Sequence, residues 1–286
     1  MTDRRIAATD RRREFLRLHE AGCFVIPNPW DVGSVRFLQS LGFKALATTS
    51  SGHAWSRGRP DGAMPLGSVL THFREIVEAT DLPVNADFGN GFAPDAVGVG
   101  VNVGLAIETG VAGLSIEDAT GDHSKPLFEI DTAISRIRAA RAAIDKAGGD
   151  TLLIGRAECF LVGLPDLDET ILRLRCYAEA GADCLYAPGI RTREEIAAVV
   201  AAVAPKPVNL LVGSASGLAF EEIAALGVRR VSVGGALART AWGAFANAAR
   251  LMAEQGRFDG FETAMSGQEL DLFFRSDSSG RVPAAP

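Results

Sequence analysis

The sequence lacks the features of nucleic-acid-binding and membrane proteins. Its 286 residues carry a formal net charge of −6, and its arginines are interspersed with acids, so a phosphate backbone finds no basic surface. No stretch of 18 apolar residues occurs, and residues 1–20 contain no signal-peptide-like run. We expect a soluble cytoplasmic protein that binds neither nucleic acid nor membrane, and we interpret the arginine-rich opening as a solvated helix face.

Cysteine is also scarce. The four cysteines show no Cys-x-x-Cys or paired-ligand spacing, which gives no reason to expect zinc or disulfides. We interpret most of them as small core residues, and we single out Cys159 because it follows a predicted strand directly.

Lysine and histidine offer few catalytic candidates. The lysines lie at strand starts, in a loop or on a helix, which argues against a Schiff-base aldolase. His19 and His72 fall on predicted helices and are interpreted as structural. His53 and His123 lie in long loops and could transfer protons, so we take His123 as a catalytic candidate.

Apolar runs recur eight times along the chain and predict strands. They cover residues 23–26, 44–48, 83–87, 113–117, 152–156, 183–187, 207–212 and 229–233. Helical patterns separate them, as at 129–147, 166–181, 192–203 and 219–226. This alternation predicts an α/β fold with a parallel sheet, and eight repeats predict a closed (β/α)8 TIM-type barrel. A doubly wound open sheet is the weaker alternative.

The remaining segments suggest where the site lies and how the chain associates. The long segments 49–67 and 118–128 follow strands, so we expect substrate loops or lids there. After the barrel come a helix at 236–255 and an apolar segment at 258–274, whose faces a neighbouring subunit would bury. We predict one domain over 1–274, a disordered tail over 275–286, and a homo-oligomer.

Acidic side chains stand at the ends of neighbouring strands. Asp87 ends the third strand and Glu117 the fourth, and side chains alternate along a strand, so acids from adjacent strands can converge. Carboxylates without clustered histidine or cysteine suit Mg²⁺, or Mn²⁺, rather than zinc. The alternative is that these acids cap loops or pair with Arg156.

Other rim residues suit a small carboxylate substrate. Arg156 presents a planar fork, and its alternative role is a salt bridge with Glu158 or Asp87. Ser50, Ser51 and Gly52 could bind a carboxylate through hydroxyls and backbone amides, or form an ordinary turn or helix cap. Trp30, after the first strand, completes the candidate substrate-binding set. Gly234 and Gly235 resemble a phosphate-binding turn, but they are equally typical of close packing.

The chain resembles the isocitrate lyase/phosphoenolpyruvate mutase superfamily over nearly its whole length. The resemblance rests on the segments PNPWDVGSVR, TTSSGHAWSRGRPDG, PVNADFGNG, GVAGLSIEDA, LLIGRAECF and YAEAGADCLYAPG. It implies a Mg²⁺-dependent enzyme that cleaves or forms C–C or P–C bonds through a pyruvate-like enolate. It also implies a tetramer with exchanged C-terminal helices.

Carried over by position, the resemblance assigns roles to individual residues. Ser50, Ser51 and Gly52 match the carboxylate-binding turn, Asp61, Asp87 and Glu117 match metal-shell acids, Arg156 contacts substrate, and Asn209 matches a polar position on the seventh strand.

Two departures from the family pattern matter. The family's Asp-x-Asp motif reads Asn85-Ala86-Asp87, so we expect an amide among the metal-shell residues and weaker or water-mediated metal binding. The loop DATGDHSKPLFE lacks the Lys-x-Cys-Gly-His run of isocitrate and methylisocitrate lyases, so those two activities are not expected.

Three functional hypotheses follow. The leading one is a Mg²⁺-dependent lyase or decarboxylase acting on a small 2-oxo or 2-hydroxy di- or tricarboxylate. The alternatives are a P–C bond enzyme of the phosphonopyruvate hydrolase or phosphoenolpyruvate mutase type, and a catalytically silent carboxylate-binding protein.

Overall fold

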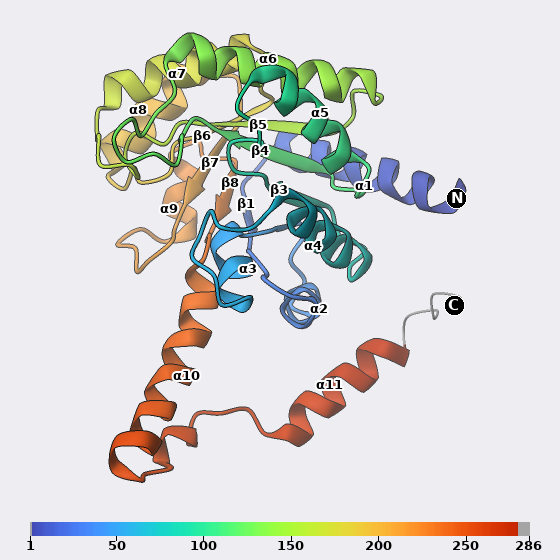
Figure 1. Ribbon diagram of the computed structural model, residues 1–286, viewed down its shortest axis with the longest axis vertical. Coiled ribbons are helices and arrows are strands. Elements are labelled where there is room, and N and C mark those ends of the chain that lie inside the picture. The colour runs from blue at the N-terminus through green and yellow to red at the C-terminus, as the bar shows by residue number, and fades with distance from the viewer. Residues whose placement is uncertain (1, 280–286) are drawn as a thin grey trace. The chain divides into compact units, whose positions relative to one another are not determined.

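Eight parallel strands form the centre of the computed structural model, which describes residues 2–279 (Figure 1). The strands are β1 (Phe24–Ile26), β2 (Leu46–Ala47), β3 (Val84–Asp87), β4 (Gly113–Glu117), β5 (Leu152–Arg156), β6 (Cys184–Tyr186), β7 (Val208–Leu211) and β8 (Arg230–Ser232). Each pairs in parallel with its neighbour in the order β1-β8-β7-β6-β5-β4-β3-β2. The predicted barrel and all eight strand positions are confirmed.

The barrel closes between β1 and β2, where the strands are joined less extensively than by a regular ladder of hydrogen bonds. The amide of Ala47 donates to the carbonyl of Pro27 at 3.0 Å. The buried Asn28 side chain donates to the Thr48 carbonyl and accepts from the amides of Val233 and Gly234, each at 2.9 Å. One amide side chain therefore joins the ends of β1, β2 and β8.

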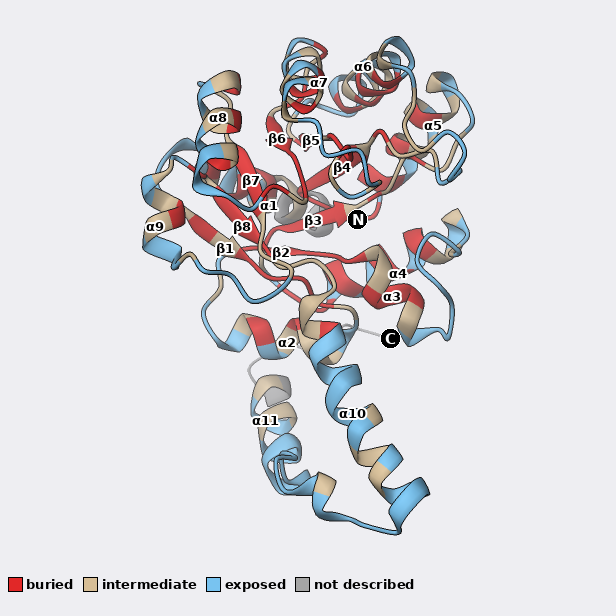
Figure 2. Cartoon of the chain, turned by 90° about the vertical axis from the view of Figure 1, so that its left-hand side faces the viewer, coloured by how far each residue is buried: buried red, intermediate tan, exposed pale blue. Residues whose placement is uncertain are grey.

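Helices cover the outside of the barrel and bury only their inner faces (Figure 2). They are α2 (Val32–Ser40), α4 (Leu66–Glu78), α5 (Ala96–Ile107), α6 (Ile130–Lys146), α7 (Leu167–Glu179), α8 (Arg193–Val203) and α9 (Phe220–Ala225). On α6, for example, Ala133, Ile137, Ala140 and Ile144 recur at helical spacing and are buried. Burying each isoleucine stabilises the fold by about 1.5–3 kcal/mol.

One face of helix α1 (Thr2–Glu20) packs against the amino-terminal end of the barrel. Phe15 is fully buried in the barrel interior. Arg12 donates to the carbonyls of Val111 and Ile107, each at 3.1 Å, and pairs with Asp150 at 3.0 Å. The interpretation of the opening as a solvated face is therefore wrong for Arg12, because the carbonyls at the barrel base need donors, whereas Arg13 is exposed as expected.

The two predicted substrate loops contain more structure than expected. The short helix α3 (Ser50–Ser56) opens the first segment, so His53 lies on a helix and is buried, not in a loop. In the second, an antiparallel bridge pairs Ala119 with Leu127, and Asp122 at its tip accepts from Ser124. That second segment is a small folded excursion after β4.

The chain divides into two compact units, residues 1–237 and 238–286. The second contains most of α10 (Ala236–Gln255), the 3₁₀ turn η1 (Asp259–Phe261) and α11 (Gly267–Ser279). Residues 275–279, which we expected in the disordered tail, form the end of α11, and 280–286 lie outside the described residues. No described helix is long and apolar enough to cross a membrane.

Candidate active site

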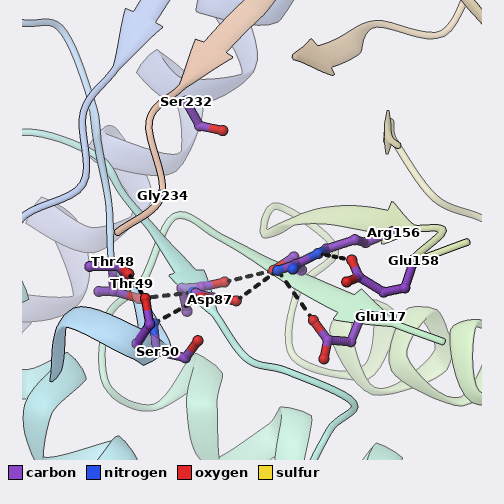
Figure 3. A network of polar contacts seen from close by, with 12 residues as sticks. Thr48, Thr49, Ser50, Asp87, Glu117, Arg156, Glu158, Ser232 and Gly234 are labelled. Carbon is purple, nitrogen blue, oxygen red and sulfur yellow. Dashed lines mark hydrogen bonds and ion pairs between the residues drawn. The ribbon is translucent and has the colours of Figure 1, made fainter. Parts of the chain in front are cut away.

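A single guanidinium joins three carboxylates at the carboxyl-terminal rim of the barrel (Figure 3). Arg156 Nη1 lies 3.3 Å from Asp87 Oδ1 and 3.2 Å from Glu117 Oε2, and Arg156 Nε donates to Glu158 Oε1. Strand register explains the convergence, because Glu117 pairs with Arg156 across β4 and β5. The sequence analysis placed these side chains at the rim, and the structure brings Asp87, Glu117 and Arg156 into contact.

Asp87 also connects the rim to helix α3. Its Oδ2 accepts from the Ser50 amide at 2.9 Å, and its own amide donates to Thr48 Oγ1 at 2.8 Å. Ser50 in turn donates a side-chain hydrogen bond to Asp61. The first turn of α3 is therefore fixed beside the carboxylate of β3.

The Ser-Ser-Gly run forms that first turn. Thr49 is the N-cap, and its Oγ1 accepts from the Gly52 amide at 3.3 Å and contacts Ser51 Oγ at 3.1 Å. Gly235 lies against this turn, because an added Cβ would come 2.7 Å from Ser51 Oγ. The pair Gly234–Gly235 thus allows close packing of β8 on α3, which favours the packing interpretation over a phosphate-binding turn.

The charges in this cluster do not balance. Four carboxylates, those of Asp61, Asp87, Glu117 and Glu158, act on one guanidinium. Removal from water raises the pKa of Glu117 to about 8, although Arg156 opposes the shift. Burial likewise raises the pKa of Glu158 and of Asp61. Burial alone would lower the pKa of Arg156, but Glu158 and Glu117 raise it, so the guanidinium stays charged.

Glu158 forms the salt bridge with Arg156 that the sequence suggested as an alternative, and Asp118, to which the sequence analysis gave no role, holds Glu158 in place. Asp118, 2% exposed, accepts from the Glu158 amide at 2.8 Å, from Arg173 at 3.2 Å and from the Tyr177 hydroxyl at 2.5 Å. These bonds fix the end of β5 next to Glu158. The signal was present in part, because Glu158 is two residues beyond Arg156 and so shares its strand face.

Tyr186 is a further neighbour of Arg156. It is level with Arg156 across β5 and β6, and its ring centroid lies 5.2 Å from the guanidinium carbon. An aromatic face at this distance stabilises a cation and restricts its orientation.

Asn85 and Asn209 lie deeper in the barrel, not with Asp87. Both are buried around Arg230, which donates to Asn209 Oδ1 at 2.9 Å and to Asn85 Oδ1 at 3.4 Å. Asn209 also donates to Ser232 Oγ at 3.0 Å. Buried amides that satisfy a buried guanidinium have a structural function. Both amides therefore have Arg230 as a partner in this structure, and the metal-shell role of Asn85 and the substrate role of Asn209 stay predictions.

Trp30 and His123 make no contact with the cluster in the described part of the chain. The Trp30 amide donates to Ser34 Oγ at 3.1 Å at the start of α2, and the Trp30 side chain is half-buried. His123 is exposed at the tip of the excursion after β4. A catalytic role for His123 stays a prediction that requires this tip to reach the rim.

Sequence comparison decides the family. The model of the family described as phosphoenolpyruvate phosphomutase matches residues 15–253. The chain belongs to the phosphoenolpyruvate mutase family. The resemblance to the isocitrate lyase/phosphoenolpyruvate mutase superfamily is thereby confirmed, as is the prediction of an enzyme of this carbon–carbon lyase superfamily.

Two curated relatives illustrate the range within the family. An uncharacterised protein of Mycobacterium tuberculosis H37Rv is 30% identical over 244 residues, covering 84% of this chain and 89% of its own. An oxaloacetate decarboxylase of Bradyrhizobium sp. ORS 278 is 32% identical over 201 residues, covering 67% and 68%.

Solved structures show the same architecture. A protein of Burkholderia cenocepacia J2315 described as a lyase/mutase superposes with a TM-score of 0.91 at 46% identity, covering 94% of this chain and 98% of its own. A 2,3-dimethylmalate lyase superposes at 0.82 with 28% identity, covering 96% of each chain. A phosphonopyruvate hydrolase in complex with oxalate and Mg²⁺ superposes at 0.82 with 25% identity, covering 95% and 96%.

Of the segment Asn85-Ala86-Asp87, which corresponds to the family's Asp-x-Asp motif in the resemblance, Asp87 is the residue that lies among the rim carboxylates.

Proposed function

We propose that the protein is a Mg²⁺-dependent lyase or decarboxylase that cleaves a carbon–carbon bond in a small 2-oxo or 2-hydroxy di- or tricarboxylate, with oxaloacetate-like acids as the first candidates. The observation that carries the proposal is the cluster in which Arg156 contacts Asp87, Glu117 and Glu158 at the rim of a family barrel. Such a cluster combines a permanent cation with an excess of oxygen donors.

The donor set fits a hard divalent cation. The rim offers carboxylate oxygens, and the pKa of Glu117 is raised first by removal from water and then by the neighbouring carboxylates of Glu158 and Asp87. No three His, Cys, Asp or Glu side chains form a complete metal-ligand group within the described residues. Mg²⁺ needs only one or two carboxylates, since waters and substrate oxygens complete its shell. Asp87 and Glu117, with Asp61 nearby, would hold Mg²⁺ or Mn²⁺.

The chain's own residues would bind and orient the substrate. Bound metal would supply Lewis-acid stabilisation of substrate oxygens. Arg156, held by Glu158 and by the Tyr186 ring, directs a fixed positive charge at the rim. The Ser51 amide lies in the first turn of α3, where the N–H groups of a helix have no acceptor within the helix. The hydroxyls of Ser50 and Ser51 lie beside it. Donors on one side and a guanidinium on the other suit a carboxylate and a developing oxyanion.

Pyruvate release from a substrate panel tests this proposal. The panel contains oxaloacetate, 2,3-dimethylmalate, methylisocitrate and phosphonopyruvate, each assayed with Mg²⁺ and with chelator. We expect chelator-sensitive release from a C–C substrate that falls by at least 10²-fold in Asp87→Ala. Glu75→Ala, at an exposed acid on α4 away from the rim, is the matched control and retains activity.

The other outcomes distinguish the alternatives. Release only from phosphonopyruvate would favour a P–C bond enzyme, which the family description also supports. Tight carboxylate binding without turnover of any compound would support a silent binding protein and overturn the lyase proposal.

We also propose that the protein assembles as a homotetramer. The proposal rests on the apolar side chains that the C-terminal unit leaves exposed, among them Phe245 at 63% and Phe258 at 64%. Exchange of these helices between subunits would bury them.

A further inference from the structure

A buried guanidinium lies in the barrel interior without an acidic partner. Arg230, the first residue of β8, is 2% exposed, and no salt bridge joins it to an Asp or Glu side chain in the described part of the chain. Its Nε donates to Asn209 Oδ1 at 2.9 Å, and its Nη1 lies 3.4 Å from Asn85 Oδ1 and from His19 Nε2. A guanidinium keeps its charge and cannot accept, so each of these partners must present a lone pair.

The partners toward the base of the barrel agree with this direction. His19 Nδ1 lies 2.7 Å from the Phe15 carbonyl, so Nδ1 carries the proton and Nε2 accepts from Arg230. Burial lowers the pKa of His19 to about 3, so the ring is neutral. Asn85 turns its Nδ2 to the Ala86 carbonyl at 3.2 Å, which leaves its Oδ1 for Arg230. Arg230 is therefore surrounded by acceptors.

A line of hydrogen bonds runs from Arg230 toward the rim. Asn209 is fully buried, and because its Oδ1 accepts from Arg230, its Nδ2 donates, to Ser232 Oγ at 3.0 Å. The Ser232 hydroxyl keeps its own hydrogen, which it donates to the Tyr186 hydroxyl oxygen. We call Arg230, Asn209 and Ser232 the donor chain, because each of its members donates to the next group on the way to the rim.

Tyr186 brings the end of this chain to the candidate active site. It is the last residue of β6 and is level with Arg156 on one side and Asn209 on the other. Figure 3 shows the Ser232 side chain pointing toward the side of the barrel that carries Arg156. Burial raises the pKa of Tyr186 to about 12, although donation from Ser232 opposes the shift, so the phenol is protonated at neutral pH. Since its oxygen accepts from Ser232, its own hydrogen is left to donate.

We propose that the Tyr186 hydroxyl donates a hydrogen bond to an anionic oxygen of the substrate. The donor chain holds the hydroxyl in this orientation, so its three members are positioning residues. The inference rests on the proposed function, because the anion is the acid seated between α3 and Arg156. Tyr186 adds a neutral donor in the barrel interior to the guanidinium of Arg156 and the first-turn amide of α3. A buried network with satisfied members fixes such a donor more rigidly than a single contact.

Oxalate binding tests this role without turnover. Oxalate is a small planar dianion that resembles the enolate of a 2-oxo acid, and it is titrated calorimetrically into protein with saturating Mg²⁺. We expect Tyr186→Phe to weaken binding by about tenfold or more, as for a lost hydrogen bond to a charged group. Ser232→Ala should weaken binding by about threefold, as for a lost neutral hydrogen bond. Ser135→Ala, at an exposed serine on α6, is the control and should bind oxalate like the natural protein.

The double variant separates a positioning role from an independent one. If Ser232 acts through the Tyr186 hydroxyl, Ser232→Ala should cause no further loss of oxalate affinity in the Tyr186→Phe background.

Carbon NMR reports contact with the hydroxyl directly. The chain has only two tyrosines, Tyr177 and Tyr186, so tyrosine labelled with ¹³C at Cζ gives two resonances, and Tyr186→Phe assigns them. Oxalate should shift the Tyr186 resonance and leave that of Tyr177 in place, because the Tyr177 hydroxyl is bound to Asp118.

The remaining outcomes separate this inference from the proposed function. Equal oxalate affinity of the natural protein and Tyr186→Phe, or a Tyr186 resonance that oxalate does not shift, would overturn the inference. The same Ser232→Ala effect with and without the Tyr186 hydroxyl would overturn the positioning role of the donor chain. Oxalate binding that depends on Tyr186, without pyruvate release from any panel compound, would overturn only the lyase proposal. Failure of oxalate to bind the natural protein would overturn both.

Discussion

Asp118 shows how one buried carboxylate orders the catalytic rim without belonging to it. It binds Arg173 and the Tyr177 hydroxyl, and its other oxygen accepts from the Glu158 amide. Burial and the adjacent Asp118 charge raise the pKa of Tyr177, so the phenol stays protonated and donates. The side chain thus connects α7 to the ends of β4 and β5.

Removing this carboxylate should destabilise the protein strongly. In Asp118→Ala the Tyr177 hydroxyl and the Glu158 amide lose their acceptor, while Arg173 keeps Glu169 and the Phe128 carbonyl, so we expect a loss of about 1–3 kcal/mol for buried groups left unpaired. Urea unfolding followed by circular dichroism measures the loss. Asp122→Ala, at an exposed loop position, should change stability by less than about 0.5 kcal/mol. A loss in Asp118→Ala no larger than that of Asp122→Ala would contradict a structural role for the Asp118 carboxylate.

At the scale of single residues, the sequence predicted which residues form the site better than it predicted the contacts of each side chain. Strand-end acids and Arg156 were found because alternation and parallel register follow from local patterns. The contact of Asn85 with Arg230 was not predicted, because the two residues are 145 positions apart in sequence and only the folded barrel brings them together. The role of Asp118 depends on α7, whose partners are 55 and 59 residues away in sequence.

Helices α3 and α4 show how two elements share one buried aromatic contact. His53 on α3 stacks on His72 on α4, and both side chains are less than 5% exposed. Desolvation is the main cause that lowers the pKa of His72 to about 3. In the unfolded chain the same ring titrates near its ordinary value of 6.5.

This difference predicts a pH-dependent stability. Between pH 6.5 and 3 the unfolded state binds a proton at His72 that the folded state does not, so stability falls as pH falls through this window. We expect His72→Phe to reduce the slope of unfolding free energy against pH by about 1.4 kcal/mol per unit between pH 4 and 6. Urea titrations at four pH values measure the slope. An unchanged slope in His72→Phe would contradict the prediction that the buried ring is neutral. His123→Gln, at an exposed position, is the control and should have the slope of the natural protein.

Element prediction succeeded where periodicity was strong and failed where it was not. The strands and α6 to α9 have apolar periodicity that a local reading detects. Helix α3 is only seven residues long and contains Gly52, so capping by Thr49 and burial of His53 stabilise it more than propensity does. Helix α1 was recognised, but its docking depends on barrel carbonyls that are distant in sequence.

At the scale of the whole molecule, the C-terminal unit leaves many of its large apolar side chains exposed. Trp242 is 44% exposed and Leu272 59%, and α10 buries only Ala238. Aromatic pairs within the unit, such as Trp242–Phe245, do not cover these rings. Exposed apolar patches of this kind are typical of subunit interfaces.

We therefore expect the helical extension to govern assembly. The full chain should have the mass of a tetramer in light scattering coupled to gel filtration, and a chain ending at Gln255 should have a lower mass. The barrel unit should stay folded after truncation, because residues 1–237 contain the core clusters. A monomeric full-length chain, or an unchanged mass after truncation, would contradict exchange of these helices.

The Asn28 side chain lies where we expect the ring of strands to open first. A ring of strands closed by one backbone hydrogen bond and one amide side chain, next to a strand of only two residues, opens most easily at that seam. Deuterium uptake should therefore be faster at the Ala47 and Gly234 amides than at the centres of β4 and β5. Ser50 and Asp87 lie beside the seam, so the part of the ring that opens first also carries residues of the proposed substrate and metal site.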